Sequence, residues 1–227
     1  MADNKKHQPT ENEQNVGQTV SSIETFLKEN GNKISYVVIA ILVIVAACLL
    51  FNRYVSAPKI QEALGQSFTA EQYFAQGDFE KALNGDGNAL GLLDVIDEYG
   101  KKAGAIVYFE AGVCQLQLKN YNEAINYLNK YKGKDNIISG RAQCCLGDAY
   151  VGLGDFNKAI SCYEKAIKVN GDNILSAQYL FKAGLVAEEM GQTEKALGYY
   201  DQIQVKYPQS PEAVDIDKYI YRVKNSK

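Results

Sequence analysis

The chain has 227 residues, which suits one or two domains and is enough for a buried core. Apolar residues make up 46 % and charged residues 22 %, and the formal net charge is −3. Phosphate binding needs a concentrated basic surface, and no Lys/Arg-rich block occurs along the chain. The composition therefore argues against a nucleic-acid partner.

The N-terminal residues 1–33 are polar, and residues 1–19 are predicted to be disordered. From Val20 to Lys28 the apolar residues fall on one helical face, and Glu29-Asn30-Gly31-Asn32 is expected to end this short amphipathic helix. The helix is interpreted either as lying on the inner membrane surface or as a plain lead-in to the segment that follows.

The stretch from Ile34 to Phe51 contains 18 residues without a charge, a proline or a glycine. At ~1.5 Å per residue it spans about 27 Å, close to the hydrocarbon core of a bilayer. Tyr36 and Tyr54 lie near its two ends, where amphipathic rings prefer the interface. We expect a transmembrane anchor over residues 34–54.

Three other interpretations of this run compete with the anchor. A buried helix of a soluble protein would show a polar face, and this run shows none. A cleaved signal peptide would have a short basic lead instead of 33 mixed residues. Val45-Ala46-Ala47-Cys48 resembles a lipoprotein cleavage site, but the apolar run continues past the cysteine. The uncleaved anchor is favoured.

Lysines are slightly more frequent before the anchor than directly after it. Lys5, Lys6, Lys28 and Lys33 precede it, and Arg53 and Lys59 follow closely. Because positive residues favour the cytoplasmic side, the N-terminus is predicted to be cytoplasmic. The remaining domain would then lie across the inner membrane, in the periplasm of a bacterium.

After the anchor a short motif recurs four times: a glycine or lysine, a capping residue, an aromatic or similar residue, and then alanine. The four copies begin at Gly77, Lys119, Gly154 and Gly191. The glycine suits the end of one helix, the Asp or Asn caps the next, and the alanine lets two helices approach closely. The pattern predicts an all-α solenoid of antiparallel helix hairpins.

The third copy is the cleanest, with Leu146-Gly147, Tyr150, Gly154, Ala159 and Tyr163 at the characteristic spacings. At these positions the chain resembles the tetratricopeptide-repeat (TPR) family. The resemblance implies a degenerate repeat over 58–100, repeats over 105–136, 140–173 and 177–210, and a capping helix over 211–224 that closes the stack.

A second resemblance covers nearly the whole chain and rests on Ile23-Glu24-Thr25-Phe26-Leu27-Lys28-Glu29-Asn30-Gly31 and an anchor ending in Asn52-Arg53-Tyr54. In this order the chain is similar to the YfgM-like family of bacterial inner-membrane proteins. The region from Phe79 to Gly100 resembles TPR proteins of Bacteroidetes-type bacteria. The resemblance implies an accessory role at the Sec translocon, with translocon subunits, chaperones or client polypeptides as partners.

Candidate catalytic groups are sparse. The only histidine is His7, and the cysteines at 114, 144, 145 and 162 lie in helical patterns without ligand spacing, so they are interpreted as packing residues. Gly85-Asp86-Gly87-Asn88 is interpreted as a turn instead of a phosphate loop. We expect no enzymatic activity, no cofactor and no metal.

In a TPR stack the first helix of each hairpin lines a concave groove, so the family register implies a partner-binding surface. The groove residues so implied are Phe109, Val113, Leu116, Arg141, Cys144, Asp148, Val151, Gln178, Phe181, Leu185 and Glu188. Phe109, Leu116, Phe181 and Leu185 are expected to form an exposed apolar strip for a peptide, a helix or a partly folded client. The alternative is that these residues pack on neighbouring elements of the stack.

Three functions remain open at this point. The first is a membrane-anchored binding module of the secretion machinery or its clients. The second is a structural adaptor for another envelope complex, in division or outer-membrane assembly. The third is a subunit of an enzyme whose chemistry lies in a partner chain.

Overall fold

The computed structural model describes the backbone of residues 11–225 and the side chains of residues 28–225. These residues form helices and connecting turns without a β-strand, so the prediction of an all-α fold is confirmed for them. The chain divides into two compact units, residues 1–58 and 59–227. Each is described by itself below.

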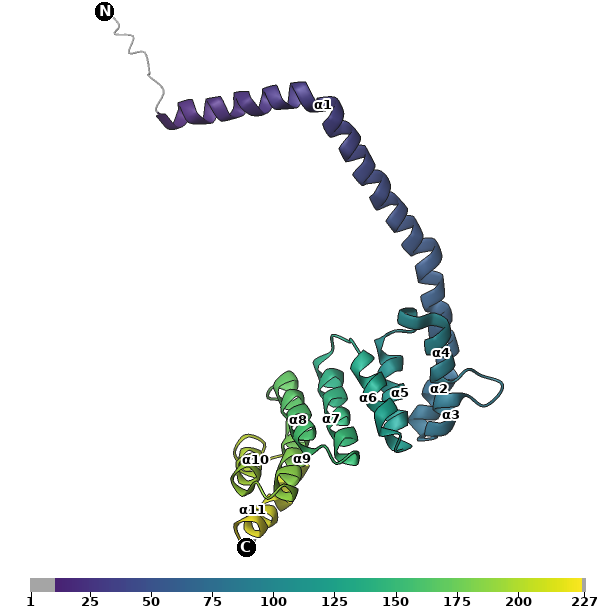
Figure 1. Ribbon diagram of the computed structural model, residues 1–227, viewed down its shortest axis with the longest axis vertical. Coiled ribbons are helices and arrows are strands. Elements are labelled where there is room, and N and C mark those ends of the chain that lie inside the picture. Colours follow the sequence, from purple (N-terminus) through teal and green to yellow (C-terminus); the bar gives the residue numbers. More distant parts are fainter. Residues whose placement is uncertain (1–10, 226–227) are drawn as a thin grey trace, which may run out of the picture. The chain divides into compact units, whose positions relative to one another are not determined.

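The first unit consists of α1 (Glu11–Phe51) followed by the short π-helix η1 (Asn52–Ser56) (Figure 1). Two predictions are wrong here: residues 11–19 are helical, and the helix does not end at Glu29–Asn32. One glycine inside a helix costs only ~1 kcal/mol, so Gly31 does not stop a helix that continues into a long apolar run. Residues 1–10 lie outside the described part.

The apolar run predicted as an anchor lies entirely within α1. Its large side chains are exposed, as Val37, Leu42 and Phe51 illustrate with 59 %, 61 % and 59 %. Among the described residues, one helix is long and apolar enough to cross a membrane, and it runs from Lys28 to Gln76. The run meets the length and composition requirements of a transmembrane helix.

The helix continues past the predicted anchor end through η1 into α2 (Ala57–Gln76). Pro58 lies near the start of α2. In a regular α-helix its missing N–H would leave the carbonyl of Tyr54 without a hydrogen bond, and its ring would clash with that carbonyl. The wider π turn directly before it is a known way of absorbing such a disruption.

The second unit opens with a hairpin whose second helix is short. The hairpin consists of α2 from residue 59 on and α3 (Phe79–Asn84). It is followed by α4 (Leu92–Tyr99) and the 3₁₀ turn η2 (Gly100–Ala103). The loop after α3 is closed by Asp86, whose Oδ1 accepts bonds from the backbone N–H groups of Asn88 and Ala89 at 2.9 and 2.8 Å. The interpretation of Gly85–Asn88 as a turn between helices is confirmed.

Three regular hairpins follow, and a cap ends the stack (Figure 1). The hairpins are α5 (Ala105–Gln117) with α6 (Tyr121–Lys130), α7 (Asn136–Gly152) with α8 (Phe156–Asn170), and α9 (Ser176–Glu189) with α10 (Thr193–Lys206). The cap is η3 (Pro211–Asp215) and α11 (Ile216–Asn225).

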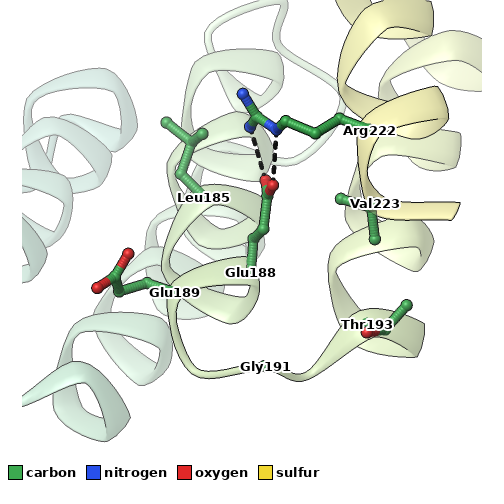
Figure 2. A pocket seen from close by; sticks show the side chains of 7 residues that line it. All are labelled: Leu185, Glu188, Glu189, Gly191, Thr193, Arg222 and Val223. Atoms are coloured by element: carbon green, nitrogen blue, oxygen red, sulfur yellow. Dashed lines mark hydrogen bonds and ion pairs between the residues drawn. The ribbon is translucent and has the colours of Figure 1, made fainter. Parts of the chain in front are cut away.

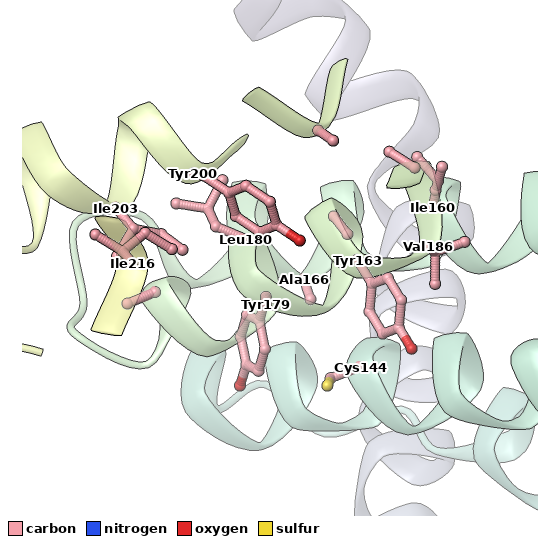
Figure 3. Packing of buried hydrophobic residues seen from close by; sticks show 14 of the residues in the cluster. Cys144, Ile160, Tyr163, Ala166, Tyr179, Leu180, Val186, Tyr200, Ile203 and Ile216 are labelled. Carbon is pink, nitrogen blue, oxygen red and sulfur yellow. The ribbon is translucent and has the colours of Figure 1, made fainter. Parts of the chain in front are cut away.

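Glycine–aromatic contacts hold the two helices of a hairpin together. A Cβ on Gly147 would lie 2.4 Å from Cε1 of Tyr163, and one on Gly184 would lie 2.3 Å from Cε1 of Tyr200. Both tyrosines are buried in the largest core cluster, which joins α7 to α11 (Figure 3). The helices approach so closely because glycine leaves room for the ring.

Candidate partner-binding surface

The predicted groove residues lie on the first helices of the three hairpins, α5, α7 and α9. The structure separates them by exposure. Arg141, Gln178 and Leu185 are exposed; Val113, Leu116, Asp148, Val151, Phe181 and Glu188 are half-buried; Phe109 and Cys144 are buried. They do not form one uniform strip.

Phe109 and Cys144 correct the sequence-based expectation. Phe109 is 6 % exposed, packs with Leu128, Ala142 and Leu146, and meets the ring of Tyr131 edge-on at 5.9 Å. Cys144 is 5 % exposed and belongs to the neighbouring core cluster. The alternative reading, packing between neighbouring hairpins, holds for both residues.

Phe181 lies against the cap. Its ring meets Tyr219 of α11 edge-on with centroids 4.8 Å apart, and it is 6.1 Å from the ring of Tyr200. Such pairs contribute ~0.5–1.5 kcal/mol beyond the area they bury. Leu185 lies one turn further along α9 and is 37 % exposed. It is the apolar residue of the predicted groove whose side chain remains accessible to a partner.

Asp148 links the second and third hairpins. Its carboxylate accepts bonds from the Nζ of Lys182 at 2.6 Å and from the hydroxyl of Tyr163 at 2.8 Å. Both charged side chains are under a third exposed. Burial, with the negative charge of Asp148 second, raises the pKa of Tyr163, so its hydroxyl stays a donor.

Glu188 of α9 has a similar pair of partners, a basic side chain of the cap and a tyrosine of its own hairpin. Arg222 donates from Nε and Nη2 to the two carboxylate oxygens at 2.7 and 2.8 Å (Figure 2). The hydroxyl of Tyr200 donates to the same carboxylate at 3.1 Å. The bonds from Arg222 keep the pKa of Glu188 below its usual value. This fork ties α11 to α9.

Two cavities open beside Leu185. The first, about 740 Å³, lies next to the Glu188–Arg222 pair and includes Glu189 and Thr193 (Figure 2). The second, about 470 Å³, is lined by Gln178, Phe181, Lys182, Leu185, Pro211, Glu212, Asp215 and Tyr219. Together they present one exposed leucine between charged and hydrogen-bonding side chains, which suits an apolar side chain of a polypeptide with polar neighbours.

Lys182, Tyr219 and Arg222 also belong to this surface, although the repeat register did not predict them. A signal was present for two of them. Arg222 lies 34 residues after Glu188, and Lys182 lies 34 residues after Asp148, which is one repeat length in each case. Opposite charges at that separation indicate ion pairs between neighbouring repeats.

The thiols of the second unit are packing groups. Burial raises the pKa of Cys114 and Cys144 to about 12 and that of Cys145 to about 11. At neutral pH they are protonated and are therefore poor nucleophiles and metal ligands. Within the residues searched, no three His, Cys, Asp or Glu side chains group together as a metal site would require.

Comparisons with known proteins agree with the hairpin stack. Tetratricopeptide-repeat family models match residues 138–203 and 105–132. The heat shock protein STI1 of Saccharomyces cerevisiae is 29 % identical over 47 % of this chain and only 18 % of its own length. The photosystem I assembly protein Ycf3 of Prochlorococcus marinus is 27 % identical over 55 % of this chain and 71 % of its own.

A solved structure supports the fold. The crystal structure of MamA protein has a TM-score of 0.55 and 23 % identity, covering 71 % of this chain and 82 % of that one. Tetratricopeptide repeats are protein-interaction modules, typically without catalytic activity. The hairpins, their glycine–aromatic contacts and the family matches identify the chain as one that carries tetratricopeptide repeats between residues 105 and 203.

Proposed function

We propose that the protein is a membrane-anchored TPR module that binds a polypeptide partner through the surface around Leu185. The observation that carries the proposal is the exposed leucine between two cavities of about 740 and 470 Å³, bordered by the ion pair of Glu188 with Arg222. Apolar burial at such a point contributes ~25 cal/mol per Å², less the cost of ordering the partner.

In this proposal the anchor is the apolar run in α1, with the N-terminus in the cytoplasm and the repeats in the periplasm. The support is the length and exposure of the run and the small excess of lysines before it. The partners are translocon subunits, chaperones or clients of the secretion machinery, as the YfgM-like resemblance implies.

A second candidate is a role in assembling another multi-subunit envelope complex. It is favoured by the name of one relative, a photosystem I assembly protein that aligns over 71 % of its length. The two candidates share the binding surface and differ in the partner that occupies it.

The binding surface is tested with two exposed leucines. Leu185→Ser removes the apolar centre of the surface, whereas Leu153→Ser, at the tip of the α7–α8 hairpin, is a matched control with 45 % exposure. Because neither residue is in the core, both variants are expected to keep the helical circular dichroism and melting temperature of the parent.

The expected difference is in partner capture from native membranes. Chemical crosslinking followed by mass spectrometry is expected to give at least a fivefold loss of the crosslinked partner for Leu185→Ser and no loss for Leu153→Ser. Equal capture by the two variants would place the binding surface elsewhere.

The topology is tested with reporters fused after Lys227. Alkaline phosphatase is expected to be active there and unmodified green fluorescent protein to be dark, because the first requires export and the second fails to mature after it. The reverse result would place the repeats in the cytoplasm.

A further inference from the structure

A second surface lies along the first two regular hairpins. Three adjoining cavities of about 670, 410 and 220 Å³ are lined by residues from η2 through α5, α6 and α7 to α8. The first two share Asn129 and Lys132, and the last two share Asn129, Gln143 and Lys165. Because they share lining residues, the three cavities adjoin along one surface.

Lysines line this surface from three helical elements and one turn. Lys101 comes from η2, Lys130 and Lys132 from the end of α6 and the turn after it, and Lys165 from α8. A further lysine, Lys158, lies at the far end and pairs with Asp155 at 2.6 Å. We refer to this surface as the basic furrow, defined by Lys101, Asn129, Lys130, Lys132, Gln143 and Lys165.

The furrow is basic without local compensation. None of its three cavities has an aspartate or glutamate in its lining. In the described part of the chain, Lys101, Lys130, Lys132 and Lys165 have no ion-pair partner. The cavities around Leu185 differ, because Glu188, Glu189, Glu212 and Asp215 line them. Positive charge is therefore concentrated in the furrow of a chain whose net charge is −3.

We propose that the basic furrow binds an extended acidic segment of a protein partner. Four ammonium groups attract carboxylates, and the amides of Asn129 and Gln143 and the hydroxyl-bearing Tyr108 can bond a peptide backbone. This surface is separate from the one around Leu185, so the proposal goes beyond the function proposed above.

The shape and composition favour a peptide over the other polyanions. The four lysines are exposed, and the amides of Asn129 and Gln143 lie between them in the cavity linings, which suits the carboxylates and the backbone of a peptide. The lining contains the rings of Tyr108, Tyr131 and Tyr150, so a single-stranded nucleic acid is one of the outcomes that the test separates. The tetratricopeptide repeats that carry the furrow and the net charge of −3 favour a protein partner.

The test uses the full-length protein in neutral detergent and fluorescence anisotropy. The probe is a labelled twelve-residue peptide of alternating Glu and Ser, and the control peptide has Gln in place of Glu. The test variant is Lys130→Gln with Lys132→Gln. The matched control is Lys195→Gln with Lys206→Gln, two exposed lysines of α10 away from the furrow.

The Glu peptide is expected to bind the parent and the α10 control equally, and at least tenfold more weakly to the furrow variant. Binding is expected to weaken with added salt because the lysines are exposed. The Gln peptide is expected not to bind. Equal losses for the two double variants would overturn the proposal, and so would equal binding of the two peptides.

Two further probes separate the competing ligands. Vesicles of phosphatidylcholine with 30 % phosphatidylglycerol and a twelve-nucleotide dT strand are offered to the same variants, with the protein held in phosphatidylcholine nanodiscs for the vesicle experiment. Binding of either probe that depends on Lys130 and Lys132, without binding of the Glu peptide, would overturn the proposal in favour of a membrane or a nucleic-acid contact.

Discussion

Glu110 of α5 is a carboxyl group in an unfavourable place. Its Oε2 is buried without a hydrogen-bond partner, and Glu71 of α2 adds a second negative charge nearby. Burial first, and the charge of Glu71 second, raise the pKa of Glu110 to about 7. The protonated form is therefore the one that suits the contact of α5 with its neighbours.

A pH dependence follows from this shift. The pKa of Glu110 in the folded protein lies above the unfolded value of 4.5. The stabilisation that protonated Glu110 gives the fold is therefore complete below pH 4.5 and is lost as the pH rises through about 7. Glu110→Gln is expected to raise the free energy of unfolding at pH 8 by roughly 2 kcal/mol and to change it little at pH 5.

Thermal melts of the full-length protein in detergent at the two pH values measure the effect. Glu123→Gln, an exposed carboxyl of α6, is the control and is expected to leave the melting temperature unchanged at both. An equal effect of Glu110→Gln at pH 5 and pH 8 would show that Glu110 does not titrate in this range.

At the scale of elements, the helical glycines of the hairpins are of two kinds, those that contact the partner helix and those that do not. Gly184 of α9 faces the ring of Tyr200, whereas Gly198 of α10 has no atom within 4 Å of a built Cβ. Gly184→Ala is expected to destabilise the fold by ~1–3 kcal/mol through overpacking, and Gly198→Ala to stabilise it by ~0.5–1 kcal/mol through helix propensity.

Chemical denaturation of the two variants beside the parent tests this contrast. Shifts of opposite sign in the denaturation midpoint are expected. If Gly184→Ala were as stable as Gly198→Ala, the close contact of α9 with α10 through Tyr200 would be wrong.

The sequence predicted the hairpins well because their signals are local. Asp78 and Asp155 cap α3 and α8 by accepting from the backbone N–H of Lys81 and Lys158. Even the departure at Lys119 keeps the local geometry, since this lysine adopts a left-handed φ of 64° where the other repeats have glycine. Short-range chemistry of this kind is readable without a structure.

The exposure of the groove residues could not be predicted from such local signals. Whether Phe109 is open or buried depends on how the next hairpin packs on α5, and Phe181 depends on Tyr219, 38 positions later in the chain. The continuation of α1 through Gly31 was also missed, because a weak local break does not overcome helix formation on both sides. Non-local packing decides such cases.

At the scale of the whole molecule, two features define what the protein presents to its surroundings. The first unit carries a long helix with exposed apolar side chains, which is long and apolar enough to cross a membrane. The second carries a repeat stack with an open leucine on one surface and the basic furrow on another. Both surfaces of the stack favour polypeptide partners over small substrates.

The central claim, that the repeats bind a polypeptide at the surface around Leu185, is tested most directly by site-specific photocrosslinking in native membranes. A benzoylphenylalanine at Gln178, an exposed residue lining the cavity beside Leu185, is compared with one at Lys195, an exposed residue of α10. A discrete polypeptide adduct is expected from position 178, absent from position 195 and lost when Leu185→Ser is added. Adducts of the same identity and yield from both positions, or none from position 178, would contradict the account.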